Sequence, residues 1–257
     1  MVDGIFDSHA HYDDKAFDPD RDTVLRSLAG AGVRRVMNVG SDMESSRSGI
    51  GLGRIYPFLW SSVGIHPASA EEATEENLSL LAELSQEPKV MAIGEIGLDY
   101  HYDDSCPREV QLLAFERQLQ LARELDLPVI IHSREAANDT MALLKKYRPC
   151  GIVHCFSGSL EMAKEVLKLD MYIGFTGVLT FKNARKAVEV AAYAPADRLL
   201  LETDCPYMAP EPLRGRRCDS TMLPYTLEKL AAIKGLSPEE MASITFRNAC
   251  TVYGIAD

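Results

Sequence analysis

The feature of this sequence that most limits its possible folds is an eightfold alternation of short apolar runs with longer amphipathic segments. The apolar runs cover residues 4–9, 33–40, 59–66, 89–97, 128–133, 151–156, 172–179 and 198–204. The segments between them, such as 107–126 and 135–147, carry helical periodicity. This alternation predicts parallel strands joined by helical crossovers. The tail, residues 221–254, is expected to form two further helices, with Pro238 in the first turn of the last one.

Such an alternation can close into a barrel or remain an open, doubly wound sheet. The phosphate-binding patterns GxGxxG and GxxxxGK(S/T) are absent, which weakens the nucleotide-binding open sheet. Polar residues instead recur at the carboxyl ends of the first, fourth, fifth, sixth and eighth expected strands, and only a closed barrel brings the first and eighth together. We therefore expect an α/β fold, a single (β/α)8 TIM barrel over residues 1–257, with a metal site at the C-terminal face of its strands.

The formal net charge of −11 restricts the partners that this chain can bind. A protein that grips long duplex DNA presents a broad basic face, so we do not expect tight binding along an extended duplex. The opening MVDGIFDSHAH lacks the features of a signal peptide, and no apolar run is long enough to cross a bilayer. We expect a cytoplasmic protein with no membrane association and no obligate protein partner.

The first expected strand ends in two histidines that could share a metal ion. His9 and His11 are two residues apart, so their side chains point to the same face of a strand. Alone, such a pair is a weak signal, because it also occurs by chance on protein surfaces. Asp7 is in phase with both in the segment IFDSHAHYD, which strengthens the interpretation as a metal site.

Three side chains from the middle of the chain extend this candidate ligand set. Glu95 lies late in the fourth run between Gly94 and Gly97, and glycines there would allow close approach to the backbone. Burying this carboxylate is costly unless a cation or a hydrogen-bond network compensates. We favour a carboxylate that bridges two metals over a structural salt bridge. His132 and His154 end the fifth and sixth strands; singly, each would be more typical of a hydrogen-bonded core residue.

The eighth run, LLLETDCP, adds an acidic residue. Glu202 and Asp204 share one face of the expected strand, and Asp204 is favoured because it stands nearer the mouth of the barrel. A carboxylated lysine, which bridges the metals in several related barrels, is excluded here. Lys89, the only lysine in the fourth expected strand, lies six residues before Glu95 and therefore at the opposite end of the barrel.

The six predicted metal ligands are His9, His11, Glu95, His132, His154 and Asp204. Imidazoles and carboxylates suit Zn, Mn or Fe, and carboxylate-rich sets also admit Mg. Two divalent ions about 3.5–4 Å apart would lower the pKa of bound water and stabilise both oxygens of a displacement. We predict Glu95, as the metal bridge, and Asp204, as the proton acceptor, to be catalytic. The sequence has no GxSxG elbow, so metal-activated water is favoured over a covalent intermediate.

Taken together, the motifs resemble those of the TatD family of metal-dependent deoxyribonucleases. They are IFDSHAHYD (5–13), VGIHP (63–67), IGEIGLDY (93–100), PVIIHSREA (128–136), VHCFSG (153–158), LLLETDCPYMAP (199–210) and RNACTVYG (247–254). The resemblance implies one ion held by His9, His11, Glu95 and Asp204, and a second held by Glu95, His132 and His154. It also implies hydrolysis of DNA phosphodiester bonds, often exonucleolytic, with two divalent metal ions (Mg, Mn or Zn).

The sequence departs from the family pattern at two places. Asn138 and then Asp139 stand where the family usually has an acid, and Cys218 and Asp219 replace the usual Asn and Glu after the eighth strand. Neither departure affects a predicted ligand. They put the substrate preference in doubt, and the chemistry is unaffected.

Three side chains near the mouth of the barrel are candidates for substrate contact: His66, Arg134 and Arg214. Arg134 follows the histidine of the fifth strand by two residues and could hold a phosphate oxygen. Arg214 lies in the loop after the eighth strand, where barrels often bind phosphate, and the resemblance favours it over Arg216 and Arg217, which we expect on the surface. His66 could donate a hydrogen bond to the substrate or orient a ligand.

The leading hypothesis is a nuclease that acts on DNA ends or single-stranded DNA. The alternative is an amidohydrolase or an aminoacyl-ester deacylase with the same two-metal site, because fold and ligands alone do not separate attack on phosphorus from attack on a carbonyl carbon. A non-catalytic metal-bound scaffold is disfavoured by the intact set of ligands.

Overall fold

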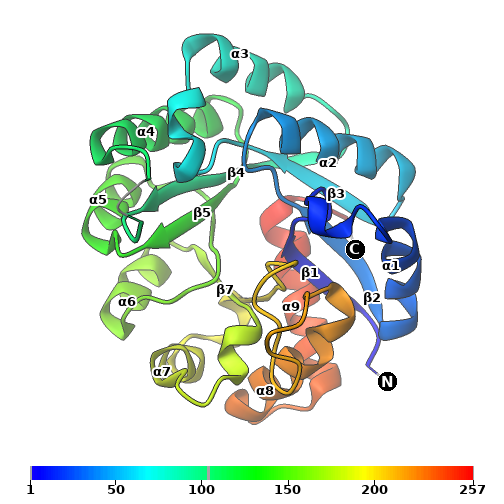
Figure 1. Cartoon of the computed structure of the whole chain (residues 1–257). Helices are drawn as coiled ribbons and strands as arrows, with labels where there is room; N and C mark the ends of the chain where they lie inside the picture. Colours follow the sequence, from blue (N-terminus) through cyan, green and yellow to red (C-terminus); the bar gives the residue numbers. More distant parts are fainter. Residues whose placement is uncertain (1, 103–104, 257) are drawn as a thin grey trace.

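One eight-stranded parallel sheet forms the centre of the molecule. The computed structural model describes residues 2–102 and 105–256. The strands follow the chain order: β1 (Ile5–Ala10), β2 (Val33–Asn38), β3 (Leu59–Val63), β4 (Val90–Asp99), β5 (Val129–Arg134), β6 (Gly151–Val153), β7 (Tyr172–Phe175) and β8 (Leu199–Leu201). Helices surround this sheet (Figure 1). Because the outer face is covered by helices and the inner face is filled, the strands are apolar along most of their length.

The last strand returns to the first, so the sheet is nearly closed into a barrel. The Ser8 hydroxyl donates to the carbonyl of Leu201 at 3.1 Å. Just beyond β8, the amide of Asp204 donates to the carbonyl of His9 at 2.9 Å, and the amide of His11 donates to the carbonyl of Cys205 at 2.9 Å. The predicted (β/α)8 barrel is thereby confirmed, and the carboxyl ends of β1 and β8 are adjacent.

The helices occupy the positions that the amphipathic segments predict. They are α1 (Arg21–Ser27), α2 (Met43–Ile55), α3 (Glu75–Leu84), α4 (Arg108–Glu124), α5 (Ala137–Tyr147), α6 (Leu160–Lys168), α7 (Arg185–Tyr193), α8 (Leu223–Lys234) and α9 (Pro238–Tyr253). The tail forms two helices as expected, and Ser237 and Glu240 form a capping box that starts α9 at Pro238. None of the helices in the described part of the chain has the length and hydropathy that a membrane crossing requires.

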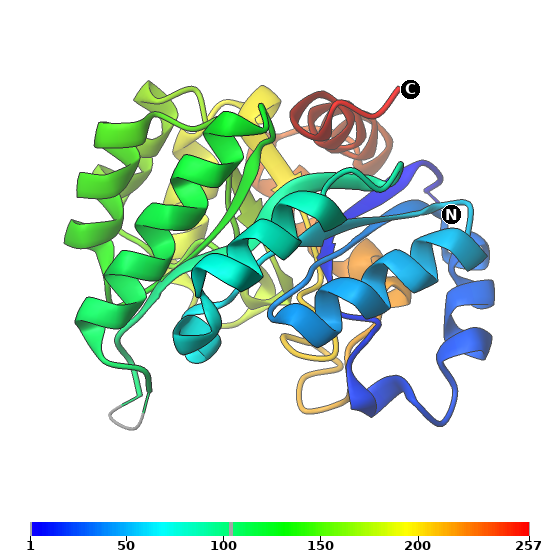
Figure 2. The same ribbon diagram turned by 90° about the horizontal axis from the view of Figure 1, so that it is seen from above.

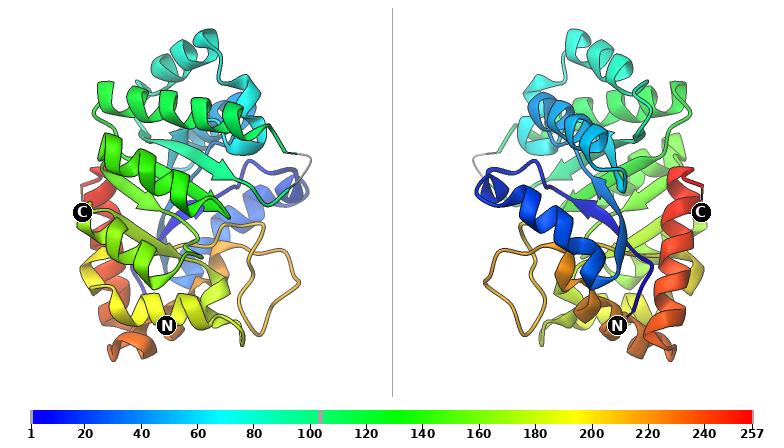
Figure 3. Two further views of the ribbon diagram at one scale, coloured as in Figure 1. Left: turned by 90° about the vertical axis from the view of Figure 1, so that its left-hand side faces the viewer. Right: turned by 90° about the vertical axis from the view of Figure 1, so that its right-hand side faces the viewer.

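The two ends of the barrel differ in structure. At the amino end, Phe6, Ile130 and Leu200 fill the interior and pack with Tyr253 of α9, whose hydroxyl donates to the carbonyl of Ser8 at 2.7 Å. In Figures 2 and 3, α9 lies along this end, whereas the long loop after β8 projects from the opposite end. The amino end is therefore a closed core, and the carboxyl end is left to the loops that follow the strands.

Several strands end earlier than the apolar runs predict. β6 stops at Val153 and β8 at Leu201, and the backbone then turns through positive φ at Cys155 (41°) and Asp204 (59°). β3 stops at Val63, and His66 instead caps the 3-10 helix η3 (Pro67–Glu72), because the ring of Pro67 suits the first turn of a helix. His154, Asp204 and His66 thus stand beyond the ends of their strands, and His11 likewise follows the last residue of β1.

Candidate metal centre

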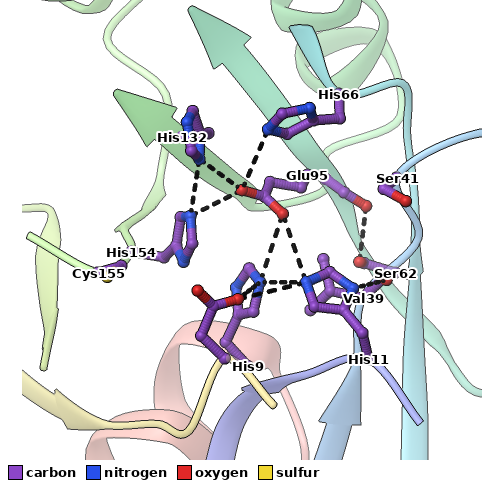
Figure 4. Close-up of polar contacts among 12 residues, drawn as sticks. His9, His11, Val39, Ser41, Ser62, His66, Glu95, His132, His154 and Cys155 are labelled. Carbon is purple, nitrogen blue, oxygen red and sulfur yellow. Dashed lines mark hydrogen bonds and ion pairs between the residues drawn. The ribbon is translucent and has the colours of Figure 1, made fainter. Parts of the chain in front are cut away.

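The carboxylate of Glu95 is the centre of a cluster of histidines at the carboxyl end of the barrel (Figure 4). Its Oε1 atom lies 2.8 Å from Nδ1 of His132 and 2.7 Å from Nε2 of His154. Its Oε2 atom faces the other way and lies 3.4 Å from Nε2 of His9 and 3.6 Å from Nε2 of His11. The two oxygens of one buried carboxylate therefore face two separate pairs of imidazoles.

Asp204 adds a second carboxylate to the side of Oε2. Its Oδ1 atom lies 3.7 Å from Nε2 of His9 and 3.5 Å from Nε2 of His11. The backbone amide of Asp204 donates a hydrogen bond to the carbonyl of His9, which holds Asp204 against β1. The barrel seam therefore positions the Asp204 carboxylate beside the two histidines. All six predicted ligands are thus brought together from β1, β4, β5 and the segments after β1, β6 and β8.

A close approach of β4 to β5 brings the Glu95 side chain to His132. Gly97 adopts a φ of +145°, and a Cβ atom at this position would lie 2.0 Å from the carbonyl oxygen of His132. A side chain is therefore excluded at Gly97 by space as well as by conformation. The register also shifts between Ile93 and Ile96, and this irregularity contains Glu95.

The hydrogen bonds on the far side of two rings show what these imidazoles present to the centre. Nδ1 of His11 lies 2.9 Å from the carbonyl of Val39, which only accepts, so this nitrogen carries the proton. Nε2 of His132 lies 3.1 Å from Oδ2 of Asp99, which accepts in the same way. In the neutral rings, the lone pairs of Nε2 of His11 and Nδ1 of His132 then point at the carboxylate of Glu95. Lone pairs that face an anion need a positive charge between them.

The short distances between histidine nitrogens also indicate that a positive charge belongs between them. Nε2 of His9 and Nε2 of His11 are 3.1 Å apart, and Nδ1 of His132 and Nε2 of His154 are 3.2 Å apart. Among the described residues, the groups able to hold a metal ion include His9, His11 and Glu95 as one set and Glu95, His132 and His154 as another. The donor set of imidazoles and carboxylates therefore suits divalent cations.

The pKa values of the predicted ligands also indicate that positive charge is favoured at this site. Burial disfavours a charged His11, but hydrogen bonding to Asp204 and the charge of Glu95 raise its pKa to about 10. Burial likewise opposes a charged His132, yet Asp99 and Glu95 raise its pKa to about 9. The pKa of Glu95 stays well below its ordinary value despite burial, because His154 and His132 favour the carboxylate. Without metal ions, protons on His11 and His132 are favoured at the positions where cations would bind.

Asp99 is a member of this cluster that the sequence analysis did not single out. It ends β4 and is buried, and its Oδ1 accepts from the amide of His101 at 2.9 Å. Its backbone amide donates to Oε1 of Gln111 and its carbonyl accepts from Nε2 of Gln111, both at 2.9 Å. The spacing of two from Glu95 through Gly97 to Asp99 was the available signal, because it places Asp99 and Glu95 on the same face of the strand. The partner of its side chain, His132, comes from another strand, so the sequence alone did not connect them.

Asp7 and Glu202 are buried acids behind the cluster. Asp7 accepts from the amide and hydroxyl of Thr203 at 2.9 and 2.7 Å and from the hydroxyl of Ser220 at 2.6 Å, so it fastens β1 to the loop after β8. Glu202 accepts from the amide of Cys155, and burial raises its pKa to about 8. Its Oε1 atom lies 3.8 Å from Nδ1 of His154, whereas Asp204 faces His9 and His11.

The three predicted substrate contacts lie in different surroundings. Nε2 of His66 is 3.8 Å from Oε1 of Glu95, and its Nδ1 accepts from the amide of Ala68, so Nε2 carries a proton that faces the centre. Arg134 donates to the hydroxyl of Tyr102 at 3.1 Å. Arg214 is exposed and stacks over the ring of Phe181, 4.3 Å from its centroid.

The other residues that the sequence analysis noted near the mouth make contacts within the protein. Arg217 forms an ion pair with Asp20 at 2.7 Å, so it is fixed in place and is not a free surface residue. Asp139, at the first departure from the family pattern, accepts from the hydroxyl of Tyr100 at 2.8 Å and pairs with Arg108. It supports the loop after β4 from α5.

Lys89 takes no part in the centre. Its Nζ donates to the backbone carbonyls of Gly53, Tyr56 and Pro57, each at 2.9 Å, just before β4 begins. The exclusion of a carboxylated lysine bridge agrees with this position at the amino end of the barrel.

A cavity of about 600 Å³ opens from the cluster. His132, His154 and Asp204 lie in its lining, together with Arg134. Arg214 is not among the lining residues. The candidate centre is therefore accessible to a small substrate or to one end of a larger one.

Comparisons with known proteins agree with these features. The family model for the TatD related DNases matches residues 6–254. The metal-dependent hydrolase YabD of Bacillus subtilis (strain 168) is 42% identical over 254 residues, which cover 98% of this chain and 99% of the relative. The 3'-5' ssDNA/RNA exonuclease TatD of Salmonella typhimurium is 34% identical over 259 residues, with coverage of 98% and 99%. The crystal structure of YJJV, a TatD homologue from Escherichia coli K12, has a TM-score of 0.93 at 32% identity and covers all of both chains.

Proposed function

The chain belongs to the TatD related DNase family of metal-dependent hydrolases, and we propose that it cleaves phosphodiester bonds at the ends of unpaired DNA strands. The observation that carries this proposal is the carboxylate of Glu95, whose two oxygens face two separate pairs of imidazoles. Such an arrangement suits a bridge between two cations.

We assign the ligands accordingly. His9, His11, Glu95 and Asp204 would hold one divalent ion, and Glu95, His132 and His154 would hold the other. Mg, Mn and Zn are the candidate ions, because the donors are imidazole nitrogens and carboxylate oxygens. When bound, such a pair of ions activates water and stabilises charge on the attacking and leaving oxygens of a phosphodiester.

The protein groups around the pair would do the remaining work. Asp204 would accept a proton from the attacking water at the carboxylate oxygen that does not face His9 and His11. Arg134, which lines the same cavity, would hold a phosphate oxygen. His66 would donate from Nε2 to the substrate or to the Glu95 carboxylate. Arg214 would contact a phosphate farther out in the loop after β8.

The choice of substrate rests on a relative and on charge. The relative from Salmonella typhimurium, at 34% identity, is a 3'-5' ssDNA/RNA exonuclease. A net charge of −11 disfavours long contacts along a duplex, so a strand end held by local arginines is the better fit. We propose single-stranded DNA ends as the substrate.

A direct test uses strands labelled at either end. The protein is stripped of metal and then incubated with single-stranded and duplex DNA in the presence of Mg²⁺, Mn²⁺ or Zn²⁺, and the products are resolved by length. We expect stepwise, metal-dependent shortening of the single strand, with slower loss from the duplex. If no strand becomes shorter with any of the three metals, the proposed function is wrong.

A further inference from the structure

We propose that the cavity beside the metal centre is a pocket for the base of the terminal nucleotide. This inference rests on the proposed function and names the part of the substrate that the protein recognises. The cavity continues from His132, His154 and Asp204 into a space between the segments that follow β7 and β8. A phosphodiester at the centre would therefore have one nucleoside within reach of this space.

Part of the wall of the cavity is apolar. Phe156, Phe175, Val178, Leu179 and Met208 belong to its lining. Met208 stands out because, as a large apolar side chain in a loop, it is 39% exposed. An apolar wall around a polar floor is the combination that binds the flat, weakly polar face of a base.

The wall is built firmly. A Cβ atom on Gly177 would lie 2.1 Å from the carbonyl oxygen of Met208, so the 3-10 helix η4 (Gly177–Thr180) is pressed against the loop after β8. The amide of Glu211 donates to the hydroxyl of Thr180 at 2.8 Å and joins the same two segments. The pocket is thus held open by contacts between its own walls, as a preformed site requires.

Three cations line the cavity. They are Arg134, and Arg185 and Lys186 in the first turn of α7. Within the described ranges, none of these three side chains forms an ion pair. In a chain with a net charge of −11, three cations that line one cavity and form no ion pair among the described residues suit the phosphates on either side of a nucleoside.

The size of the cavity limits what can enter. Its volume of about 600 Å³ is within the range of small-molecule sites, roughly 300–1,000 Å³. This volume has room for the base of one nucleotide, and we take the pocket to receive a single unpaired base. An end of a duplex would have to open before its last base could enter, which makes the pocket a selector for unpaired ends.

The test measures binding without turnover. The probe is a short oligothymidylate with phosphorothioate linkages that carries 2-aminopurine as its last base, at either end in turn. The comparison strand ends in an abasic residue. We expect the wild-type protein, in the presence of Mg²⁺, to bind the strand with the terminal base about tenfold more tightly at one of the two ends.

Substitutions then locate the preference. Val178→Trp would fill the pocket and reduce the preference to less than about twofold, while binding of the abasic strand stays within about twofold of wild type. Val24→Trp makes the same exchange at a half-buried position on α1 outside the cavity, and should keep the full preference. Met208→Asn is a second variant, since Asn tolerates the positive φ of 55° there, and should weaken the preference at least threefold.

Two results would overturn the pocket: equal binding of the two strands by the wild-type protein at both ends, or a preference that survives both substitutions in folded protein. A protein that shows the preference yet cuts no DNA supports the pocket and refutes the proposed function. Cleavage without any preference for a terminal base supports the proposed function and refutes the pocket.

Discussion

Oδ2 of Asp99 lies 3.1 Å from Nε2 of His132, and the opposite nitrogen of that ring lies 2.8 Å from the Glu95 carboxylate. Asp99 is thus placed to hold the imidazole in the tautomer that a metal ion needs. Carboxylates in this position behind a metal-bound histidine typically contribute about 10–100-fold in metal affinity.

Asp99→Ala should therefore weaken metal binding by about 10–100-fold, and the melting temperature of the metal-free protein should change little. Competition with a chelator measures the affinity, and thermal unfolding without metal measures stability. Asp139→Ala, which removes an aspartate paired with Arg108 at the surface, should leave metal affinity unchanged. Equal affinity in the Asp99 variant and the wild type would remove its positioning role.

Glu95→Ala should abolish hydrolysis while the chain stays folded. One substitution removes the oxygen that faces each pair of imidazoles, so we expect kcat/KM to fall by at least about 10³-fold, on the scale of losing a main electrostatic element of a site. Glu135→Ala, at an exposed glutamate, is the control. Circular dichroism would establish folding and an oligonucleotide assay the rate; retained turnover would refute the bridging role.

Removing metal should abolish activity reversibly, and returning it should restore two ions per chain. Each ion at a concentration of 100 times its Kd would stabilise the folded state by about 2.7 kcal/mol, so the melting temperature should rise by several degrees. Metal analysis after gel filtration gives the stoichiometry. A single ion per fully active chain would contradict the two-ion assignment.

Replacing Arg134 by Ala should lower kcat/KM for an oligonucleotide by about 10–100-fold, the value of a hydrogen bond to a charged group. Arg214→Ala should have a smaller effect, because its guanidinium stacks on Phe181 outside the cavity lining. Both variants should hydrolyse a neutral ester, if the protein accepts one, at the wild-type rate. Equal losses on charged and neutral substrates would show that Arg134 acts through the fold and does not bind phosphate.

Gly97→Ala should destabilise the protein by at least about 2 kcal/mol, since the new Cβ meets the His132 carbonyl and the φ of +145° is unfavourable for alanine. The same exchange at Gly51, inside α2 with open space around it, should stabilise the protein by about 0.5–1 kcal/mol. Urea denaturation of both variants gives the two free energies of unfolding. Loss of stability at both positions would point to a general intolerance of alanine.

Much of the fold follows from the sequence because a parallel barrel buries both faces of its strands. Each strand therefore appears as a continuous apolar run, and each crossover as a helical period. The ends of the strands were less predictable. β6 and β8 stop before His154 and Asp204, because positive φ values at Cys155 and Asp204 turn the chain out of the sheet, and apolarity does not record that turn.

The candidate site was likewise only partly predictable from the sequence. Five of the six predicted ligands stand within three residues of the end of a strand, which is a local property, whereas Glu95 lies inside the longer strand β4. The roles of Asp99, Asp7 and Glu202 depend on partners from other strands. These partners follow from the register of the barrel, and the sequence states neither the register nor the shift within β4.

The seam between β1 and β8 has a consequence for synthesis of the protein. Asp204, the neighbour of His9 across the seam, follows it by 195 residues in the sequence and is therefore synthesised long after it. A growing polypeptide consequently cannot complete the predicted ligand set before Asp204 has been added. A chain that stops before Asp204 would lack the carboxylate that faces His9 and His11.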